Sequence, residues 1–469
     1  MGGMVELPLW LVVLGTAFAV VALIDRVVGP SVRWFFRQRV TRAIDEINER
    51  LQLKIQPFKL TERRVLIDRL VHDPRVQEAV EARMAESGEP RGVVMARVER
   101  YAREIVPSFS AFAYFAVGAR LARLIAQSLY RVRLGAFDEE ALERIDREAA
   151  VVFVINHRSN ADYLLVTYLA STRSALSYAV GEWARVWPLS RIIRNMGAYF
   201  IRRRSGDTLY RRVLARYVRM ATEAGVTQAI FPEGGLSRDG RPAPPKLGLL
   251  SYIVTGFDPS PNNPSAPSAA RDVVFVPVGL NYDRVLEDRV LIGSREQDGT
   301  PRFPVNAWTT AAFVLRLAWR RFSGRYYRFG YAVVGFGEPL SLKEFLAGDP
   351  GNDPVAALGA ELSARIGRVI PVLPVPLVAS VLVAAGAPLS LTEVRAAAAA
   401  LLERLNAAGA HVHMPRASLD YMVEAGLRML TLRRIVTEAG GVYTAVPEEA
   451  GLLGYYANTI AHLLPEEVG

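Results

Sequence analysis

The segment Val151–Tyr163, VVFVINHRSNADY, decides the fold class of this chain. It opens with the apolar run VVFVI, whose composition is typical of a strand buried on both faces of a sheet. The run ends in a polar stretch that contains His157 and, five residues later, Asp162. In open α/β sheets, ligands bind beyond the carboxyl ends of the strands. The segment therefore predicts an α/β fold and marks where its chemistry would lie.

Three later segments repeat this arrangement of an apolar run followed by polar residues. They are GAYFIRRRSGD at Gly197–Asp207, AIFPEGGLSRDGRPAPPK at Ala229–Lys246 and VFVPVGLNYD at Val274–Asp283. Helical patterns separate the runs, and this alternation indicates a central mixed sheet flanked by helices. We expect the four polar clusters to meet at one edge of that sheet.

The length of 469 residues favours two or three folding units. We expect an N-terminal membrane anchor helix over residues 1–30, a helical domain over 31–147, an α/β catalytic domain over 148–345 and a helical C-terminal domain over 346–469. In the last, Ser390 and Glu393 fit a capping box at the start of a helix. The apolar run PVLPVPLVASVLVAAGAP is broken by prolines and predicts a packed helix, not a membrane span.

Residues 7–24, LPLWLVVLGTAFAVVALI, carry no charge and approach the length that crosses a hydrocarbon layer about 30 Å thick. Glu6 precedes this run and several arginines follow it, so the positive-inside rule places the body of the protein in the cytoplasm, at the inner membrane. A helix lying in the bilayer surface is the alternative, because Pro8, Gly15 and Thr16 weaken a span. The segment Phe109–Val132 mixes arginines with apolar residues and suits either a headgroup-facing helix or an amphipathic core helix.

The formal charge of +10 comes almost wholly from arginine, since lysine occurs only at positions 54, 59, 246 and 343. A basic surface favours anionic partners such as phospholipid headgroups or phosphorylated substrates. The chain contains no cysteine, which excludes disulfides, thiol nucleophiles and thiolate metal sites.

His157 and Asp162 are the candidate catalytic pair. We expect His157 in the loop after the strand and Asp162 in the first turn of the next helix, where Ser159 and Asp162 fit a capping box. If a turn brings the two together, the carboxylate fixes the imidazole tautomer and the other ring nitrogen removes a proton from a hydroxyl. The alternative is that Asp162 only caps the helix and His157 is a loop residue without a chemical role.

The second and third segments supply candidate anion ligands. Arg202, Arg203 and Arg204 follow one strand, and their guanidinium groups match the geometry of phosphate. Arg238 and Lys246 add two cationic groups near Gly234 and Gly235, which allow close approach of the backbone. Glu233 could orient a substrate hydroxyl or organise the glycine turn.

Other chemistries find little support in the sequence. The window GGLSRDG lacks the last glycine of a G-x-S-x-G elbow, and there is no P-loop, G-x-G-x-x-G or HEXXH motif. His411 and His413 form a histidine pair that has no carboxylate or cysteine ligand near it in the sequence, so we predict no metal site.

The quoted motifs NHRSNAD, GAYFIRR, FPEGGLSRDGRPAPPK and VFVPVGLNYD resemble the four ordered motifs of the glycerolipid acyltransferases. The form HRSNADYLL, the extension PPKLGLL, the earlier DPRVQEAV and the late YYANTIAHLL are most similar to glycerol-3-phosphate acyltransferases. The resemblance is strong over residues 150–285 and fainter outside them.

The resemblance implies transfer of a fatty acyl group from a coenzyme A or acyl-carrier-protein thioester to the sn-1 hydroxyl of glycerol 3-phosphate, giving lysophosphatidic acid. It makes His157 the general base and Asp162 its orienting partner, with no acyl-enzyme and no cofactor beyond the thioester co-substrate. The residues that it assigns to substrate binding are Arg158, Arg202, Arg203, Glu233, Gly234, Gly235, Ser237, Arg238 and Lys246. Membrane phospholipids are the other implied partner.

Two departures from the family pattern keep alternatives open. Leu236 follows the glycines of the third motif where arginine is usual, and the chain is shorter than the long bacterial and mitochondrial members. An sn-2 acyltransferase that takes lysophosphatidic acid is one alternative, and a non-catalytic membrane lipid-binding protein is another. A nucleic-acid binder is a third, suggested by the charge and by C-terminal helices followed by GGVYTAV, but the predicted anchor argues against nucleic acid as a partner.

Overall fold

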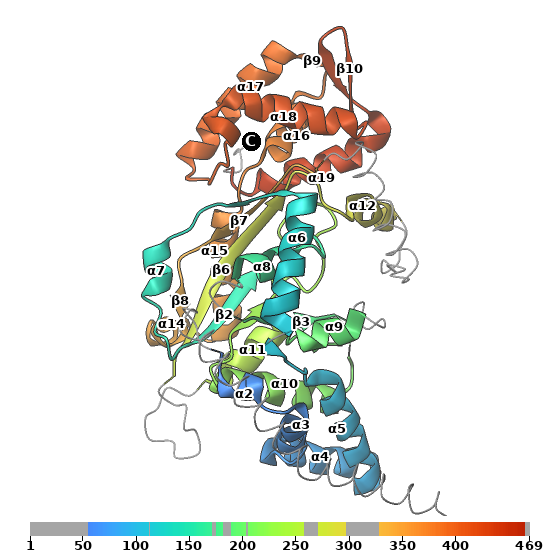
Figure 1. The fold of residues 1–469 in the computed structure, drawn as a ribbon, viewed down its shortest axis with the longest axis vertical. Coiled ribbons are helices and arrows are strands. Elements are labelled where there is room, and N and C mark those ends of the chain that lie inside the picture. Colours follow the sequence, from blue (N-terminus) through green and yellow to red (C-terminus); the bar gives the residue numbers. More distant parts are fainter. Residues whose placement is uncertain are drawn as a thin grey trace, which may run out of the picture. The chain divides into compact units, whose positions relative to one another are not determined.

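An eight-stranded mixed sheet lies at the centre of the described chain, which comprises residues 55–111, 113–170, 175–181, 189–202, 205–257, 271–296 and 328–464 of the computed structural model (Figure 1). The strand order is β1-β7-β6-β2-β5-β3-β4, and β8 pairs with β6. The strands are β1 Arg131–Leu134, β2 Ala150–Ile155, β3 Ser177–Val180, β4 Tyr199–Phe200, β5 Gln228–Ile230, β6 Val273–Tyr282, β7 Tyr331–Phe336 and β8 Leu340–Ser341. The predicted mixed sheet flanked by helices is confirmed.

The central strands are parallel and buried. Strand β2 pairs in parallel with β5 and β6, and the parallel pairing continues from β5 through β3 to β4. Strands β7 and β8 run antiparallel to β6, which makes the sheet mixed. Every residue of β2 and of β6 is buried, as strands covered on both faces require.

The N-terminal helices pack against the sheet domain through α10, Thr208–Glu223. These helices are α2 Pro57–Leu60, α3 Arg63–Val71, α4 Pro74–Ser87 and α5 Arg91–Ile105. Helix α10 turns large side chains such as Leu214 and Tyr217 inward, and its N-cap Asp207 accepts hydrogen bonds from two backbone amides of the first turn. Asp207 also accepts a hydrogen bond from Tyr101 of α5, which ties the two helices together.

Several helices connect the strands of the sheet. They are α6 Ala119–Leu129, preceded by the π-helical turn Ala113–Gly118, then α7 Glu139–Glu143, α8 Asp162–Ala170, α9 Leu189–Asn195, α11 Gly248–Val254 and α12 Asp288–Glu296. Helix α6 packs on α8, the helix that follows β2. This contact places α6 directly behind the segment that carries the predicted catalytic pair.

The C-terminal region is mainly helical, with a small three-stranded sheet. Its elements are α14 Leu342–Ala347, α15 Pro354–Val369, α16 Pro374–Ala385, β9 Leu389–Ser390, α17 Leu391–Ala407, the 3-10 turn Pro415–Ala417, α18 Leu419–Leu432, β10 Val436–Ala439, β11 Val442–Ala445, the 3-10 turn Pro447–Glu449 and α19 Ala450–Ala461. The capping box between Ser390 and Glu393 is present. Helix α16 is buried along most of its length and packs against α18 and α19, in line with the expected packed helix.

Two features differ from, or lie beyond, the sequence prediction. Arg131–Leu134, inside the region predicted to be helical, forms edge strand β1 beside β7. Local periodicity does not reveal this pairing, because the partner strand lies far along the chain. The anchor predicted over residues 1–30 lies outside the described residues, and within the described ranges no helix is long and apolar enough to cross a membrane. Residues 55–469 pack as one compact unit, so the domain boundaries inside this range remain predictions.

Candidate active site

The parallel strands bring the four predicted polar clusters toward one edge of the sheet. Strand β2 leads to His157, β4 leads to Arg202, β5 leads into the loop that begins at Phe231, and β6 leads to Asp283. Because these strands run in the same direction, their carboxyl ends share an edge. This is the placement that open α/β sheets use for ligand sites.

His157 and Asp162 meet as a buried hydrogen-bonded pair. His157 lies in the loop after β2, and Asp162 is the first residue of α8. His157 Nδ1 lies 2.8 Å from Asp162 Oδ2, and the two side chains are 1% and 0% exposed. A carboxylate at Nδ1 holds the proton of the neutral ring on that nitrogen. The lone pair of the ring is therefore on Nε2, as a general base requires.

The Nε2 atom of His157 is buried and has no hydrogen-bond partner within the described ranges. The imidazole packs against two aromatic rings, with its centroid 4.3 Å from that of Phe231 and 5.6 Å from that of Tyr163. A buried polar atom without a partner costs about 1–3 kcal/mol, which a substrate hydroxyl at Nε2 would offset.

The carboxylate of Asp162 is held by four hydrogen bonds. Besides His157, its Oδ2 accepts the backbone N–H groups of Arg158 at 2.8 Å and of Ser159 at 3.1 Å. Its Oδ1 accepts the hydroxyl of Tyr282, at the end of β6, at 2.5 Å. The bond from Ser159 N is one half of the predicted capping box, and the Ser159 hydroxyl donates elsewhere, to Glu287. The carboxylate has little freedom to rotate away from the imidazole.

Tyr282 and Glu287 are residues of the site that the sequence analysis did not single out. Glu287 accepts the hydroxyl of Ser159 at 2.7 Å through Oε2 and the N–H of Asn160 at 3.3 Å through Oε1. Burial raises the pKa of Glu287. Tyr282 belongs to the fourth quoted motif, so the sequence indicated that it lies near the site. The sequence did not indicate that its hydroxyl bonds Asp162. No local pattern pointed to Glu287, because its contacts come from a loop that precedes it by more than a hundred residues.

The loop after β5 holds the backbone of His157 from both sides. Glu233 Oε1 accepts the N–H of His157 at 3.3 Å, and Ser237 N–H donates to the carbonyl of His157 at 3.0 Å. Burial raises the pKa of Glu233 to about 7, although the charge of Arg158 and the His157 N–H act in the opposite direction. The third motif thus positions the histidine of the first.

Arg158 is fully buried, and its guanidinium donates to the carbonyl of Gly240 in the same loop. Gly240 has a φ of +86°, and a Cβ there would lie 1.9 Å from the carbonyl oxygen of Tyr455 in α19. Asn458 of α19 donates to the carbonyl of Asp239 at 2.9 Å. Arg158 and the C-terminal helix therefore hold the third motif between them.

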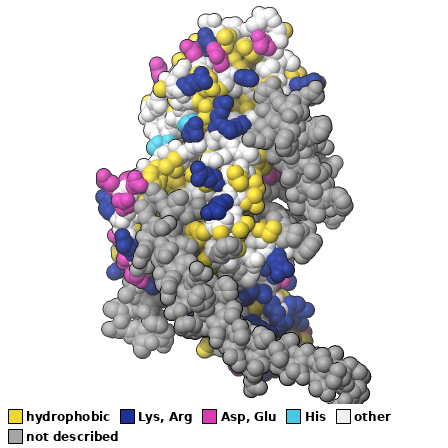
Figure 2. All heavy atoms as spheres, viewed as in Figure 1, with side chains coloured by type: hydrophobic (Ala, Val, Ile, Leu, Met, Phe, Trp, Pro, Cys, Tyr) yellow, Lys and Arg dark blue, Asp and Glu magenta, His cyan; other side chains and the backbone are white. Residues whose placement is uncertain are grey.

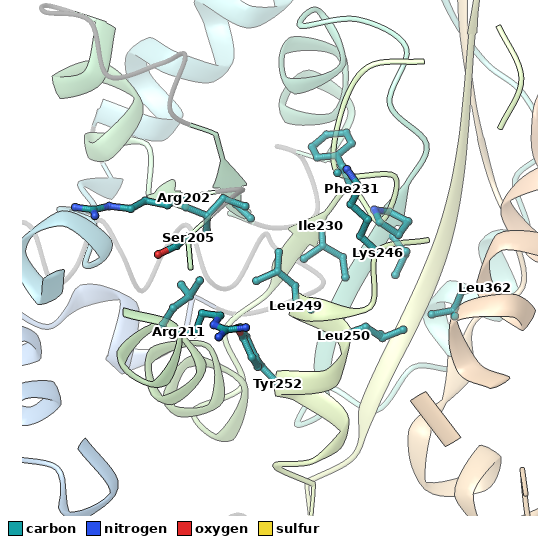
Figure 3. A pocket seen from close by; sticks show the side chains of 18 of the residues that line it. Arg202, Ser205, Arg211, Ile230, Phe231, Lys246, Leu249, Leu250, Tyr252 and Leu362 are labelled. Carbon is teal, nitrogen blue, oxygen red and sulfur yellow. The ribbon is translucent and has the colours of Figure 1, made fainter. Parts of the chain in front are cut away.

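A cavity of about 310 Å³ lies beside the dyad (Figure 3). Phe231 and Tyr163, the two rings that contact His157, line this cavity, although His157 itself does not. Much of its wall is apolar, and the apolar lining residues are Val154, Ala179, Ile201, Leu214, Ile230, Leu249, Leu250 and Leu362. Three cationic residues also line it, namely Arg202, Arg211 and Lys246. The cavity could thus accept a molecule with an anionic group and an apolar part.

The three cations differ in how their charge is used. Arg202 donates to both carboxylate oxygens of Glu104, at 2.9 and 2.7 Å, and Figure 3 shows its side chain extending away from Lys246. Lys246 and Arg211 form no ion pair within the described ranges. Arg211, on α10, was not among the predicted ligands. Helix α10 carries four arginines, at positions 211, 212, 216 and 219, and nothing in the sequence distinguished this one from the others.

The remaining predicted residues shape the loop or stand at the surface. Gly234 has a φ of +66°, and a Cβ there would lie 2.6 Å from Cδ of Lys246, so glycine lets the lysine cross the turn. The hydroxyl of Ser237 donates to the carbonyl of Arg241 at 2.9 Å and accepts the N–H of Gly240 at 3.1 Å. Gly235 is half-buried in the same loop and Arg238 is exposed. Arg203 and Arg204 lie outside the described residues.

The chain matches two family models. Residues 137–281 match the acyltransferase family, and residues 317–467 match the glycerol-3-phosphate acyltransferase C-terminal region. Among solved structures, the chain is similar to the 1-acyl-sn-glycerophosphate (LPA) acyltransferase PlsC from Thermotoga maritima, at 17% identity and a TM-score of 0.32, over 54% of this chain and 76% of that one. That TM-score is too low for the likeness to bear on function.

Curated relatives cover most of this chain. The glycerol-3-phosphate acyltransferase of Ectopseudomonas mendocina is 28% identical over 86% of the chain and 49% of its own length. That of Pseudoalteromonas atlantica is 26% identical over 89% of the chain and 52% of its own length. The chain thus spans about half the length of the curated relatives that it matches. The two matched regions are thus those of the acyltransferase family and of the glycerol-3-phosphate acyltransferase C-terminal region, and the curated relatives to which the chain is similar are glycerol-3-phosphate acyltransferases.

Proposed function

We propose that this protein transfers a fatty acyl group from a coenzyme A or acyl-carrier-protein thioester to the sn-1 hydroxyl of glycerol 3-phosphate, giving lysophosphatidic acid. The observation that carries the proposal is the buried pair of His157 and Asp162, joined at 2.8 Å beside a cavity that Lys246 and Arg211 line. The names of the family and of its curated relatives support the choice of substrates.

In the proposed reaction, Nε2 of His157 takes the proton of the acceptor hydroxyl as its oxygen attacks the thioester carbonyl. Asp162 stabilises the resulting imidazolium through Nδ1. The tetrahedral intermediate then collapses, the carbon–sulfur bond breaks, and the imidazolium returns the proton to the departing thiolate. An oxygen ester and a free thiol result, without an acyl-enzyme.

The cavity beside Phe231 supports a place for the acceptor. Lys246 and Arg211 supply positive charge for the phosphate, because their charges are not used by carboxylates in the described chain. Arg238 is exposed in the loop after β5 and would help to attract an anionic acceptor toward the cavity. Glu233 and Gly234 would shape the turn that faces the acceptor. Because Phe231 and Tyr163 contact the imidazole and line the cavity, whereas His157 does not line it, we expect one of these rings to move as the hydroxyl reaches Nε2.

We place the reaction at the inner membrane, with the catalytic domain facing the cytoplasm. The positive charge after residues 7–24 supports this orientation, and the long-chain acyl donor and the lysophospholipid product are both membrane-seeking molecules. Membrane phospholipids are then the surrounding partner.

The test is an acyl-transfer assay on detergent-solubilised protein with palmitoyl coenzyme A or acyl carrier protein as donor. Glycerol 3-phosphate and lysophosphatidic acid are compared as acceptors. Turnover of glycerol 3-phosphate is the expected result, whereas preference for the lysolipid would move the protein to the sn-2 acyltransferases. Inactivity with every pair of substrates would favour a lipid-binding protein.

A pair of histidine variants tests the mechanism in the same assay. His157→Ala should abolish transfer and leave binding of glycerol 3-phosphate largely intact. The matched control is His72→Ala, because His72 is exposed at the end of α3 and its ring bonds to the carbonyl of Asp68 in its own helix. Full activity in purified His157→Ala protein would refute the general-base role.

A further inference from the structure

Helix α6 buries three alanines and one leucine, and it exposes two other leucines to solvent. Its buried face consists of Ala119, Ala122, Ala126 and Leu129. Leu121 and Leu124 are 48% and 67% exposed, and Leu124 is the most exposed large apolar side chain in the part of the chain that the structure describes. An ordinary amphipathic helix places such leucines in the core. The exposure of Leu121 and Leu124 is therefore a feature that core packing does not explain.

The exposed apolar residues form one stripe with a cationic flank. Val117, which is 54% exposed, lies in the π-helical turn that leads into α6. It is spaced by four residues from Leu121, and Leu124 follows three residues later, so the three share one side of this continuous helical segment. Arg120 and Arg123 are exposed on the adjoining side, and neither forms an ion pair within the described ranges. The guanidinium of Arg123 lies 5.7 Å from the centroid of the Tyr168 ring. Figure 2 shows apolar and cationic side chains interleaved across the middle of this face, where Figure 1 places α6.

The charged residues along this stretch of the sequence have one sign. No acidic residue occurs between Glu104 and Asp138, while this stretch contains four arginines. Arg131 and Arg133 are exposed on β1, the edge strand that follows α6. An apolar stripe with guanidinium groups beside it matches acyl chains and phosphate headgroups together.

We propose that α6 is the surface that docks on an anionic phospholipid bilayer, with Val117, Leu121 and Leu124 among the acyl chains and Arg120 and Arg123 at the headgroup phosphates. The proposal rests on the membrane location argued above and names the surface that makes the contact. Helix α6 packs on α8, which begins at Asp162, so a bilayer at α6 would be close to the catalytic pair. Gln127 fixes this packing through the Tyr168 hydroxyl of α8, at 3.0 Å.

The absence of cysteine from the sequence allows a local test. A single cysteine is introduced as Leu124→Cys and labelled with an environment-sensitive fluorophore. The control is Leu432→Cys in α18, where the leucine is 51% exposed and lies outside α6. Both full-length proteins are mixed with vesicles of phosphatidylcholine containing phosphatidylglycerol, or of phosphatidylcholine alone.

We expect a blue shift and quenching by spin-labelled lipid at position 124, stronger with phosphatidylglycerol, and neither at position 432. An unchanged label at 124 on protein that floats with the vesicles would overturn the proposal. An apolar environment at 124 without vesicles would also overturn it, because another part of the chain would then cover the stripe. An equal response to both vesicle types would refute the charge complementarity.

A paired-leucine variant separates this proposal from the proposed chemistry. Leu121→Gln/Leu124→Gln should lose most transfer on vesicle-bound acyl donor, by roughly tenfold for about 1.4 kcal/mol of lost burial. It should keep full transfer in detergent, where no bilayer is needed. Loss in detergent as well would argue against a docking role, and an inactive wild-type protein would instead refute the proposed function.

Discussion

Tyr282 donates its hydroxyl to Oδ1 of Asp162, while Oδ2 of the same carboxylate bonds His157. Oδ1 thus fixes the position of the aspartate, and Oδ2 orients the imidazole. Tyr282 ends β6, and Asp162 begins the helix after the neighbouring strand β2. The sheet itself therefore sets the geometry of the dyad.

The first prediction concerns Tyr282→Phe. Loss of the hydroxyl leaves more negative charge on Asp162, which stabilises the imidazolium of His157. The acid limb of the pH profile of kcat/KM should therefore move to higher pH, and kcat should fall by roughly tenfold as the carboxylate gains freedom. The measurement is transfer rate against pH in detergent.

Tyr130→Phe is the matched control for this variant. The ring of Tyr130 lies 5.2 Å from that of Tyr282, and its buried hydroxyl donates to the carbonyl of Arg284. The control should lose comparable stability without moving the pH profile. A profile that shifts equally in both variants would show that the effect comes from packing and not from the bond to Asp162.

The second prediction distinguishes Lys246, as a ligand of the acceptor phosphate, from Arg202, as a member of a structural ion pair. Lys246→Met should raise KM for glycerol 3-phosphate by roughly 10- to 100-fold, the value of a hydrogen bond to a charged group, with little change in Tm. Arg202→Met should instead lower Tm, because it removes the bidentate pair with Glu104, worth about 1 kcal/mol, and should change KM by less than about threefold. A large KM effect at Arg202 with unchanged Tm would assign the phosphate to that residue.

The fold class followed from the sequence because it depends on local apolar runs. VVFVI and VFVPVGL are buried strands, and the polar residues after them reach one sheet edge. The turn between His157 and Asp162 was also foreseeable, since a loop residue and a first-turn carboxylate are neighbours in the chain. Strand β1 was missed because its pairing with β7 spans some two hundred residues.

The contacts of the arginines could not be predicted, because they depend on tertiary packing. Arg202 follows its strand as expected, yet its guanidinium forms an ion pair with Glu104 of α5. Arg158 is buried beneath Gly240, although a polar loop residue is usually exposed. Arg211 lines the cavity from an amphipathic helix that carries three other arginines.

The third prediction follows from the pKa of Glu233, which burial raises from an ordinary value of 4.5 to about 7. Between these two pH values the folded protein keeps a proton that the unfolded chain has lost. Stability therefore falls as pH rises through this window, by roughly 3 kcal/mol from this group. Glu233→Gln removes the ionisation, so the variant should gain stability relative to wild type between pH 4.5 and pH 7.

Chemical unfolding in detergent at pH 5 and pH 8 measures this difference. Some pH dependence should persist in the variant, because Asp283 also has a pKa raised by burial to about 7 and contributes with the same sign. Parallel stability curves for wild type and Glu233→Gln would contradict the prediction. Such curves would mean that Glu233 ionises as easily in the fold as in the unfolded chain.

The last prediction tests the contact between the third motif and α19. In Gly240→Ala, the new Cβ would lie 1.9 Å from the carbonyl oxygen of Tyr455, so the loop or the helix must move. The loop also holds the backbone of His157 through Ser237, so movement should reduce transfer as well as Tm. The control is Gly409→Ala, where φ is +74° and a Cβ meets nothing within 4 Å. This control should lose only about 1–2 kcal/mol of stability, because alanine is strained in the left-handed region, and its transfer activity should be unchanged. Equal losses in the two variants would mean that α19 does not hold the catalytic loop.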